Sequence, residues 1–363
     1  MLPANTPNQR PSDGRLLVVD AHGRLRHAAR GDLARVLSPG DLLVANDAAT
    51  LPASLHGHHL RTGAAIEIRL AGRRSIAADA VFEFDAVVFG AGDHCTRTED
   101  RPPPPTLLPG DTLGLGPLRA TVRKLLGHPR LVALRFAGTA DAIWAGIARH
   151  GKPIQYAHIV QPLALWDVWT RIAALPVAFE PPSAGFVLDW KLIGELAARR
   201  IGFATLTHAA GISSTGDQQL DARLPFDEPY LLPPSTVHAV EQTRQRSGRV
   251  VALGTTVVRA LEHAVSQSPR LRAGPGIATQ RIGPATRLRV VDAIITGTHE
   301  PGSSHYDLLH AFAGAALLAR ISDALEQAAY RTHEFGDSLL LQRQAEAIPR
   351  AARAVGTLSA LPA

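Results

Sequence analysis

The hydrophobic pattern of this chain changes twice, and that change restricts the possible folds more than any other feature. Between residues 51 and 150, short alternating apolar runs are interrupted by Gly and Pro, which is typical of a small barrel or sandwich. On both sides of this segment, apolar strands alternate with stretches of helical spacing. The pattern predicts a discontinuous α/β domain formed by residues 1–50 and 151–363, with a β-barrel domain inserted at 51–150.

The flanking segments are expected to form one mostly parallel sheet, because strand–helix–strand units place successive strands parallel. Residues 270–276 are expected to be a loop. The expected strands are 15–20, 42–45, 203–207, 249–253, 288–295 and 338–341, and the expected helices are 190–200, 237–246, 255–265 and 306–330.

Composition narrows the class of protein. With 363 residues, 45% of them hydrophobic, the chain can bury a large core. Its one cysteine, Cys95, excludes an internal disulfide framework and a Cys-based zinc site, as expected in the reducing cytoplasm. There is no apolar signal segment at the N-terminus, and the apolar stretch 311–321 is too short for a bilayer. A soluble cytoplasmic protein without membrane partners is expected.

The charge balance leaves a nucleic-acid partner open. Lys and Arg number 38 against 32 Asp and Glu, a net charge of +6, which is compatible with a polyanion. Almost all of these cations are arginine, a bias that genome composition also produces. One stretch concentrates them without an intervening acid, and it is either a nucleic-acid surface or a solvated face. It contains Arg119, Arg123, Lys124 and Arg130.

Several common catalytic motifs are absent from the sequence. It has no dinucleotide-binding or phosphate-binding glycine loop and no Gly-x-Ser-x-Gly nucleophile motif. His56, His58 and His59 lie close together, but they lack a carboxylate or thiolate at ligand spacing. This cluster is interpreted as a surface loop, and no metal site is predicted.

Three groups of polar residues lie at the ends of predicted strands, where an open α/β sheet binds its ligands, and a fourth lies just before the last predicted strand. His208 ends one strand and leads into a loop containing Gly211. The second group opens a helix whose free N–H groups would suit a carboxylate or phosphate. Each group alone is explained by a capped turn or a buried histidine, but several at one sheet edge favour a site. The remaining members are Gly254, Thr255, Thr256 and Arg259, then Asp292, His299 and Ser303, then Gly336 and Asp337.

Further blocks follow one another in a characteristic order. An N-terminal block contains Asn46 and Asp47, and a Pro-Ser-Ala-Gly loop contains Ser183 and Gly185. Later blocks lie at 207–211, 254–262, 290–292, 299–301, 311–314 and 335–337. Together these blocks resemble the S-adenosylmethionine:tRNA ribosyltransferase-isomerase family of queuosine biosynthesis, which has an α/β domain interrupted by a β-barrel.

The resemblance implies a transferase that moves the ribosyl portion of S-adenosylmethionine onto 7-aminomethyl-7-deazaguanine in the tRNA anticodon. The sugar is rearranged to an epoxycyclopentane, giving epoxyqueuosine and releasing adenine and methionine. His208 and His299 would then be the acid and the base, with Asp292 orienting one of them. The helix start at 254–256, helped by Arg259, would bind the methionine carboxylate. Beyond S-adenosylmethionine as co-substrate, no metal or other cofactor is implied.

The sequence also departs from the family. Residues 46–54 replace a block that carries two arginines in the family, and 220–230 replace its His-x-x-His-x-Glu stretch. Arginines and aromatic residues bind phosphates and stack on bases. The chain is therefore interpreted as a divergent paralogue. Two alternatives stay open: a paralogue that uses S-adenosylmethionine with a small-molecule acceptor, and a non-catalytic binding protein on the same scaffold.

Overall fold

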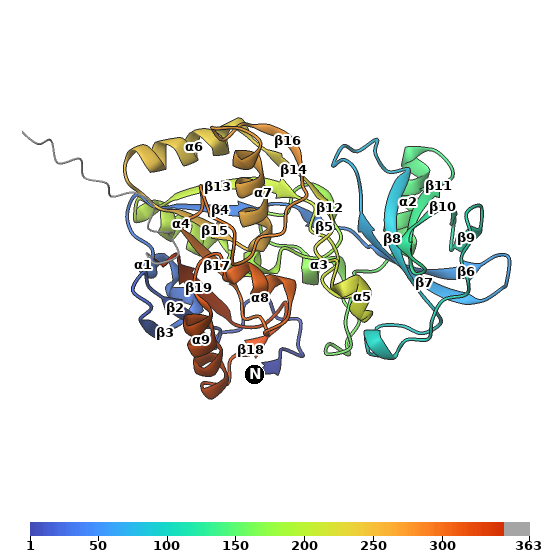
Figure 1. Ribbon diagram of the computed structural model, residues 1–363, viewed down its shortest axis with the longest axis horizontal. Coiled ribbons are helices and arrows are strands. Elements are labelled where there is room, and N and C mark those ends of the chain that lie inside the picture. The colour runs from blue at the N-terminus through green and yellow to red at the C-terminus, as the bar shows by residue number, and fades with distance from the viewer. Residues whose placement is uncertain (345–363) are drawn as a thin grey trace, which may run out of the picture.

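A nine-stranded mixed sheet forms the centre of the α/β part, at the left of Figure 1. The structure is a computed structural model, and it describes residues 1–344. The strands lie in the order β16 (Gly274–Ala278), β14 (Glu228–Leu232), β13 (Gly202–His208), β4 (Leu42–Asn46), β15 (Val250–Leu253), β17 (Ala293–Gly297), β19 (Ser338–Gln342), β2 (Arg15–Val19) and β3 (Leu25–Ala29).

This sheet is parallel in its centre and largely antiparallel at its edges. Strands β13, β4, β15 and β17 run parallel to one another, as do β19 and β2. The pairs β16–β14, β14–β13, β17–β19 and β2–β3 are antiparallel. The prediction of a mostly parallel sheet is therefore corrected at the flanks. A short turn between β2 and β3 forces that pair to be antiparallel.

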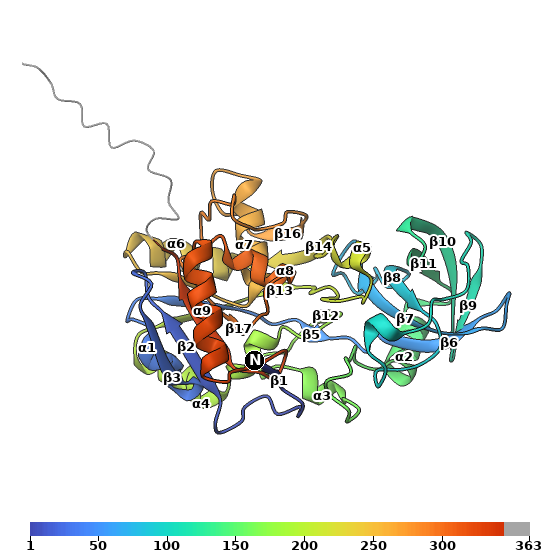
Figure 2. The same ribbon diagram turned by 60° about the horizontal axis from the view of Figure 1, so that its bottom comes forward.

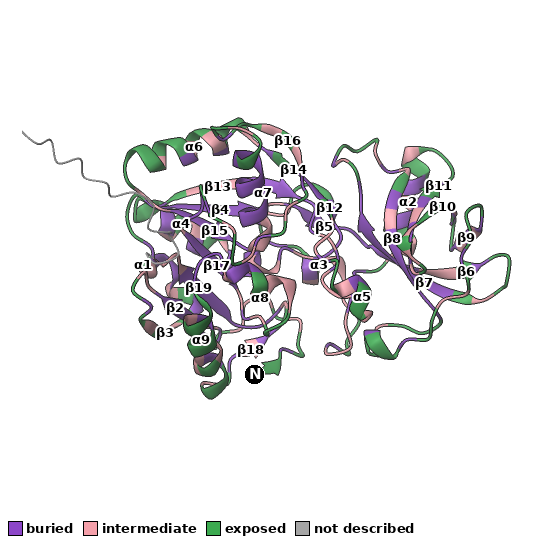
Figure 3. Cartoon of the chain, in the orientation of Figure 1, coloured by how far each residue is buried: buried purple, intermediate pink, exposed green. Residues whose placement is uncertain are grey.

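Helices cover both faces of the sheet, so its central strands are buried on both sides (Figure 3). One layer consists of α6 (Pro234–Gln245), α7 (Thr255–Ser266), α8 (Ser304–Leu309) and α9 (Ala315–Gln327). The other consists of α1 (Leu33–Val36) and α4 (Trp190–Ala198). Along β4, Leu42 and Val44 pack toward the first layer, whereas Leu43 and Ala45 pack toward the second. This two-sided burial explains why the strands read as unbroken apolar runs.

A closed six-stranded barrel is inserted into this α/β part, at the right of Figure 1. Its strands follow the order β10 (Leu118–His128), β11 (Leu131–Phe136), β8 (Glu83–Phe89), β7 (Ala65–Gly72), β6 (Ser54–His59) and β9 (Thr112–Leu115). Helix α2 (Ala140–His150) packs Ile143 and Ile147 against the barrel core. An α/β fold with an inserted barrel, as predicted, is confirmed, whereas the domain boundaries at 51 and 150 stay a prediction.

The two connections between the barrel and the sheet lie side by side. Strand β5 (Ala49–Thr50), which leads into the barrel, pairs in parallel with β12 (Pro176–Ala178), which follows it (Figure 2). The remaining short elements are β1 (Leu2–Pro3), β18 (Arg331–Thr332), α3 (Leu165–Val168), α5 (Gln218–Asp221) and 3₁₀ helices at Arg30–Asp32, Thr98–Asp100 and Ser183–Val187. Among residues 1–344, no helix is long and apolar enough to cross a bilayer.

Three local predictions differ from the structure. The expected helix 306–330 is broken between α8 and α9, where the chain turns inward to bury Phe312 completely. The expected strand 288–295 begins only at Ala293, because the buried Glu262 carboxylate accepts the N–H groups of residues 289–291 and holds them as a turn. The expected loop 270–276 contributes to β16, where Gly276 lets the Tyr230 ring lie against the backbone.

Candidate active site

A cavity of about 580 Å³ opens at the carboxyl edge of the central parallel strands. This is an ordinary size for a small-molecule site. Its walls come from the loops that follow β12, β13, β15 and β17, together with the start of α7 and with α8. Of the predicted site residues, seven line it: Ser183, Gly211, Gly254, Thr255, Thr256, Arg259 and His299. Ser303 lies at its rim, where it caps α8 beside the lining residue Ser304.

The amino end of α7 forms one wall of the cavity. Gly254 has a φ of 98°, a backbone conformation that favours glycine. A Cβ at this position would also lie 3.3 Å from the Cβ of Ala184. The first turn of α7 therefore forms part of the cavity wall. Its N–H groups have no preceding helical turn to accept their hydrogen bonds.

Asn46 and Asp47 support this wall without lining the cavity. The Asn46 side chain bridges two strands, accepting from the His208 N–H at 2.9 Å and donating to the His208 carbonyl at 2.9 Å. It also donates to Thr256 Oγ1 at 3.3 Å. Asp47 accepts from Thr207 Oγ1 at 2.6 Å. The two predicted binding residues thus fix the ends of β4 and β13 beside the helix start.

His299 brings an imidazole to the cavity wall. Its Nε2 lies 2.7 Å from Thr296 Oγ1, and its ring stacks on His305 with centroids 4.9 Å apart. Burial, and then the neighbouring His305 and His333, hold the pKa of His299 well below its ordinary value. At neutral pH the ring is uncharged, and Nδ1 makes no hydrogen bond to residues 1–344. His299 is therefore in the form that accepts a proton.

Glu180 is a second titratable group at this wall, and nothing in the sequence analysis singled it out. Its side chain accepts hydrogen bonds from Tyr156 Oη at 2.5 Å and from the Ser213 N–H at 3.1 Å. Burial raises its pKa to about 7, although Tyr156 and Ser213 act in the opposite direction. A carboxyl group with this pKa can give or take a proton near neutral pH.

Glu228 and Arg259 form a buried ion pair at the cavity wall. Glu228 also accepts the Gly211 N–H at 2.5 Å, and the Arg259 guanidinium donates to the carbonyl of Ala278 at 3.0 Å. The charge of Arg259 is therefore already matched within the protein. Arg259 therefore anchors the wall, and its predicted contact with a bound carboxylate stays a prediction.

His208 lies behind this ion pair and does not line the cavity. It is completely buried, it stacks on Tyr230, and its Nε2 lies 3.5 Å from a Glu228 oxygen. Burial, followed by the charge of Arg259, holds its pKa well below the ordinary value. A neutral ring without access to the cavity does not suit the predicted proton transfer, so we interpret His208 as a support for Glu228.

Asp292 lies at the wrong edge of the sheet. It precedes β17 and accepts the N–H of Val250, the first residue of β15, at 3.0 Å. It also pairs with Arg343 at 3.1 Å. Both contacts are at the amino ends of these parallel strands, opposite the cavity. These contacts give no support to the prediction that Asp292 orients a catalytic histidine.

Three other predicted binding residues lie outside the cavity wall and contact other parts of the protein. Asp337 pairs with Arg15 at 2.9 Å. A Cβ at Gly336 would lie 2.4 Å from the carbonyl oxygen of Arg331, and one at Gly185 would lie 2.9 Å from Thr170. These glycines permit close backbone packing, and none of the three lines the cavity.

The predicted nucleic-acid stretch divides into two parts. Arg119, Arg123 and Lys124 are exposed on β10 of the barrel. Arg130 instead covers the Phe89 ring at 4.5 Å and donates to the Thr215 carbonyl at 3.3 Å. It thereby joins the barrel to the loop before α5, and its predicted nucleic-acid contact stays a prediction.

Comparison with known proteins identifies the family of the chain. The family model described as "Queuosine biosynthesis protein" matches residues 1–341. The chain belongs to this family. It is 30% identical over 348 residues to the S-adenosylmethionine:tRNA ribosyltransferase-isomerase of Synechococcus elongatus, covering 90% of this chain and 89% of that one. The enzyme of the same name from Acidithiobacillus ferrooxidans is 33% identical over 354 residues, covering 94% and 95%.

A solved structure is also similar to the chain. The S-adenosylmethionine tRNA ribosyltransferase of Thermotoga maritima matches with a TM-score of 0.47 and 24% identity, covering 94% of this chain and 95% of that one. The sequence-based expectation that the chain is a member of the queuosine biosynthesis family is confirmed by the family model and the sequence relatives.

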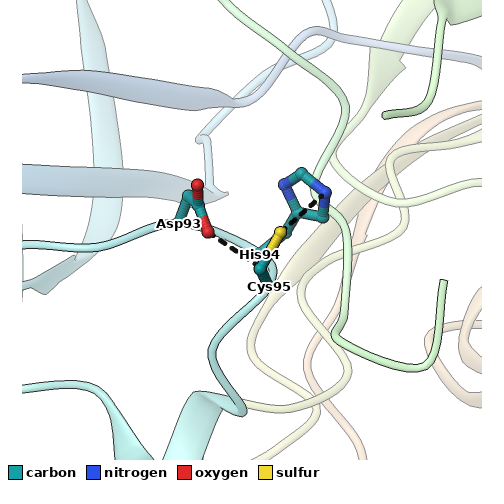
Figure 4. A group of neighbouring side chains, drawn as sticks. All are labelled: Asp93, His94 and Cys95. Atoms are coloured by element: carbon teal, nitrogen blue, oxygen red, sulfur yellow. Dashed lines mark hydrogen bonds between the residues drawn. The ribbon is translucent and has the colours of Figure 1, made fainter. Parts of the chain in front are cut away.

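Two side-chain groups of this family member have ligand types that bind metals. Asp93, His94 and Cys95 lie together on an exposed loop after β8 (Figure 4). Partial desolvation and the Asp93 carboxylate raise the pKa of the Cys95 thiol, which disfavours the thiolate that a metal needs. The three residues are also adjacent in sequence, so their proximity carries little information.

The second group consists of His158, His333 and Glu334. His158 Nε2 already pairs with the Glu334 carboxylate at 3.0 Å, and the two imidazole rings stack 4.2 Å apart at 18°. The His158–Glu334 pair and the ring stacking account for this cluster without an ion. The reaction proposed below uses no metal ion, and the expectation that none is needed stays a prediction.

Proposed function

We propose that the chain transfers the ribosyl portion of S-adenosylmethionine to 7-aminomethyl-7-deazaguanine in a tRNA anticodon, with isomerisation of the sugar. The observation that supports this most is the convergence of a helix amino end, His299 and Glu180 on one cavity. Two relatives of the chain are named S-adenosylmethionine:tRNA ribosyltransferase-isomerase. Such an enzyme would act in the cytoplasm, where its tRNA substrate is found.

The helix start accounts for binding of the methionine end. N–H groups in the first turn of α7 and the dipole of this 12-residue helix favour a carboxylate. Thr255 and Thr256 offer hydroxyl groups at the same place. Because Arg259 is engaged by Glu228, the backbone rather than a free guanidinium would carry this contact.

The proposed reaction needs one proton acceptor and one proton donor. The sulfonium acidifies the adjacent C5′–H, and removal of that proton starts the rearrangement of the sugar. Neutral His299 would take this proton. Adenine departs more readily when it is protonated, and Glu180, with a pKa of about 7, would donate to it. Both groups belong to the wall of the same cavity.

The altered N-terminal block does not favour a small-molecule acceptor. The positions where the family carries arginines are Ala49 and Ser54, and both are 4% exposed. Ser54 donates to the buried Glu67 carboxylate, which Arg69 and Arg101 neutralise. Both positions are therefore buried here, and Ser54 belongs to a neutralised buried cluster.

Adenine release tests the proposal. The purified chain is incubated with S-adenosylmethionine and with tRNA that carries 7-aminomethyl-7-deazaguanine, and adenine is quantified by chromatography. Release that requires this tRNA supports the proposal. Release with the free deazapurine and none with tRNA would indicate the small-molecule alternative. Binding of tRNA, measured by calorimetry, without any adenine release would indicate a non-catalytic protein.

A further inference from the structure

Two more hollows extend from the active cavity across the barrel. One has a volume of about 380 Å³ and shares Pro225 and Arg281 with the active cavity. The other, of about 330 Å³, shares Arg73, Arg74 and Asp85 with the first. The active cavity and the two hollows therefore lie in a row, each adjoining the next. We call the two outer ones the barrel groove, which is lined by the cations Arg73, Arg74, Arg123, Lys124, Arg223 and Arg281.

Arg73 is an unbalanced buried cation in this groove. It is 3% exposed, and its guanidinium lies near the rings of Phe84 and Trp144. Nη2 donates to the Ala77 carbonyl at 2.9 Å, but Nε and Nη1 have no acceptor among residues 1–344. Burial lowers its pKa to about 10, so it stays charged at neutral pH. A buried charge without a counterion is costly, which points to an anion as the missing partner.

The rest of the barrel groove is also positive. Its carboxylates are Glu83, Asp85 and Asp227, half the number of its cations. Glu83 is already paired with Arg135 at 2.8 Å, outside the groove. Asp85 lies 4.0 Å from Arg74. The groove therefore has uncompensated positive charge along the path that leads to the active cavity.

We propose that the barrel groove binds backbone phosphates of RNA, with one phosphate between Arg73, Arg123 and Lys124. Identifying the anion as RNA rests on the proposed function, because only a polymer of phosphates would occupy successive positions along the groove and reach the active cavity. Charge-assisted hydrogen bonds from arginine suit phosphate oxygens. Arg119, although it lies on β10, lines neither hollow and has no part in this contact.

A salt titration of tRNA binding tests the RNA contact. The variant R123A/K124A is compared with R26A/R320A, which removes two exposed cations from β3 and α9, on the α/β part away from the barrel (Figure 1). Affinity for the modified tRNA is measured by fluorescence anisotropy at several salt concentrations. The slope of log affinity against log salt should decrease by about 1 in the groove variant, because Arg123 and Lys124 contact the same proposed phosphate. It should stay unchanged in the control. Equal slopes in the two variants would overturn the proposal.

A second measurement tests the anion site without tRNA or turnover. Millimolar inorganic phosphate, compared with chloride at equal ionic strength, should raise the Tm of the wild-type chain by ~2 °C. R73M keeps the apolar stem and removes the unbalanced charge, so the variant should fold without phosphate and show no such rise. A phosphate response equal to that of the wild type would refute the role of Arg73. If adenine release fails while the phosphate response persists, the proposed function fails and the anion site stands.

Discussion

Replacement of Glu180 by Gln should stabilise the chain in alkaline solution. The burial that raises the pKa of this carboxyl to about 7, against 4.5 for an exposed one, disfavours its charged form in the fold. Between these two values the native state holds a proton that the unfolded state has lost, so stability falls as the pH rises. This difference in pKa destabilises the native state by about 3 kcal/mol above pH 7. The destabilisation is absent below about pH 4.5.

The substitution is close to isosteric. Both recorded hydrogen bonds, from Tyr156 and Ser213, end on Glu180 Oε1, which glutamine retains. Urea unfolding of E180Q and wild type at pH 5, 7 and 9 should show a difference in free energy of unfolding that grows with pH. At pH 9 the variant should be the more stable by up to about 3 kcal/mol. E241Q, on the exposed face of α6, is the matched control and should show no such trend.

The opposite result would refute the reasoning. If E180Q is destabilised by the same amount at every pH, Glu180 is ionised throughout and its charge is stabilised by the fold.

The same variant also tests the proposed role of Glu180 as the proton donor. Because glutamine cannot donate a proton in place of a carboxylic acid, kcat for adenine release should fall by roughly 10²–10⁴-fold.

Three further substitutions test other parts of the site. His299→Ala should lower kcat for adenine release by about 10²–10⁴-fold, and unchanged turnover would exclude it as the base. Arg259→Ala should reduce the free energy of unfolding by about 3–5 kcal/mol, because it leaves Glu228 as an uncompensated buried charge; a change below 1 kcal/mol in urea unfolding would contradict the ion-pair account. Asp292→Asn should leave kcat unaltered and cost about 1 kcal/mol or less in stability, whereas a large loss of activity would restore the role predicted from sequence.

The architecture could be predicted because it depends on patterns that persist along the chain. The alternation of strands and helices, interrupted by an all-β segment, indicated the sheet and the inserted barrel. The polar groups after β13, β15 and β17 indicated the edge at which the cavity lies. His299 and the start of α7 were found for this reason. In each case a local signal and the topology pointed to the same place.

The residues that were missed depend on burial and on distant partners. Glu180 is a single carboxyl residue before two prolines, and its pKa arises from a cavity wall that the sequence does not display. Glu228 is recognisable only once Arg259 is brought beside it. Asp292 was misplaced because Glu262 holds the preceding residues as a turn. The apolar run was therefore read as strand several residues before β17 begins, and the carboxylate was assigned to the wrong end of the sheet.

The pairing of β5 with β12 has a consequence for how this protein can vary. The chain leaves for the barrel and comes back from it at almost the same point, so both covalent connections of the barrel lie side by side. With the proposed RNA contact on the barrel groove, substitutions there would alter how strongly RNA is held without changing the strands that shape the reaction pocket. Recognition and chemistry can thus diverge at separate rates in a single polypeptide.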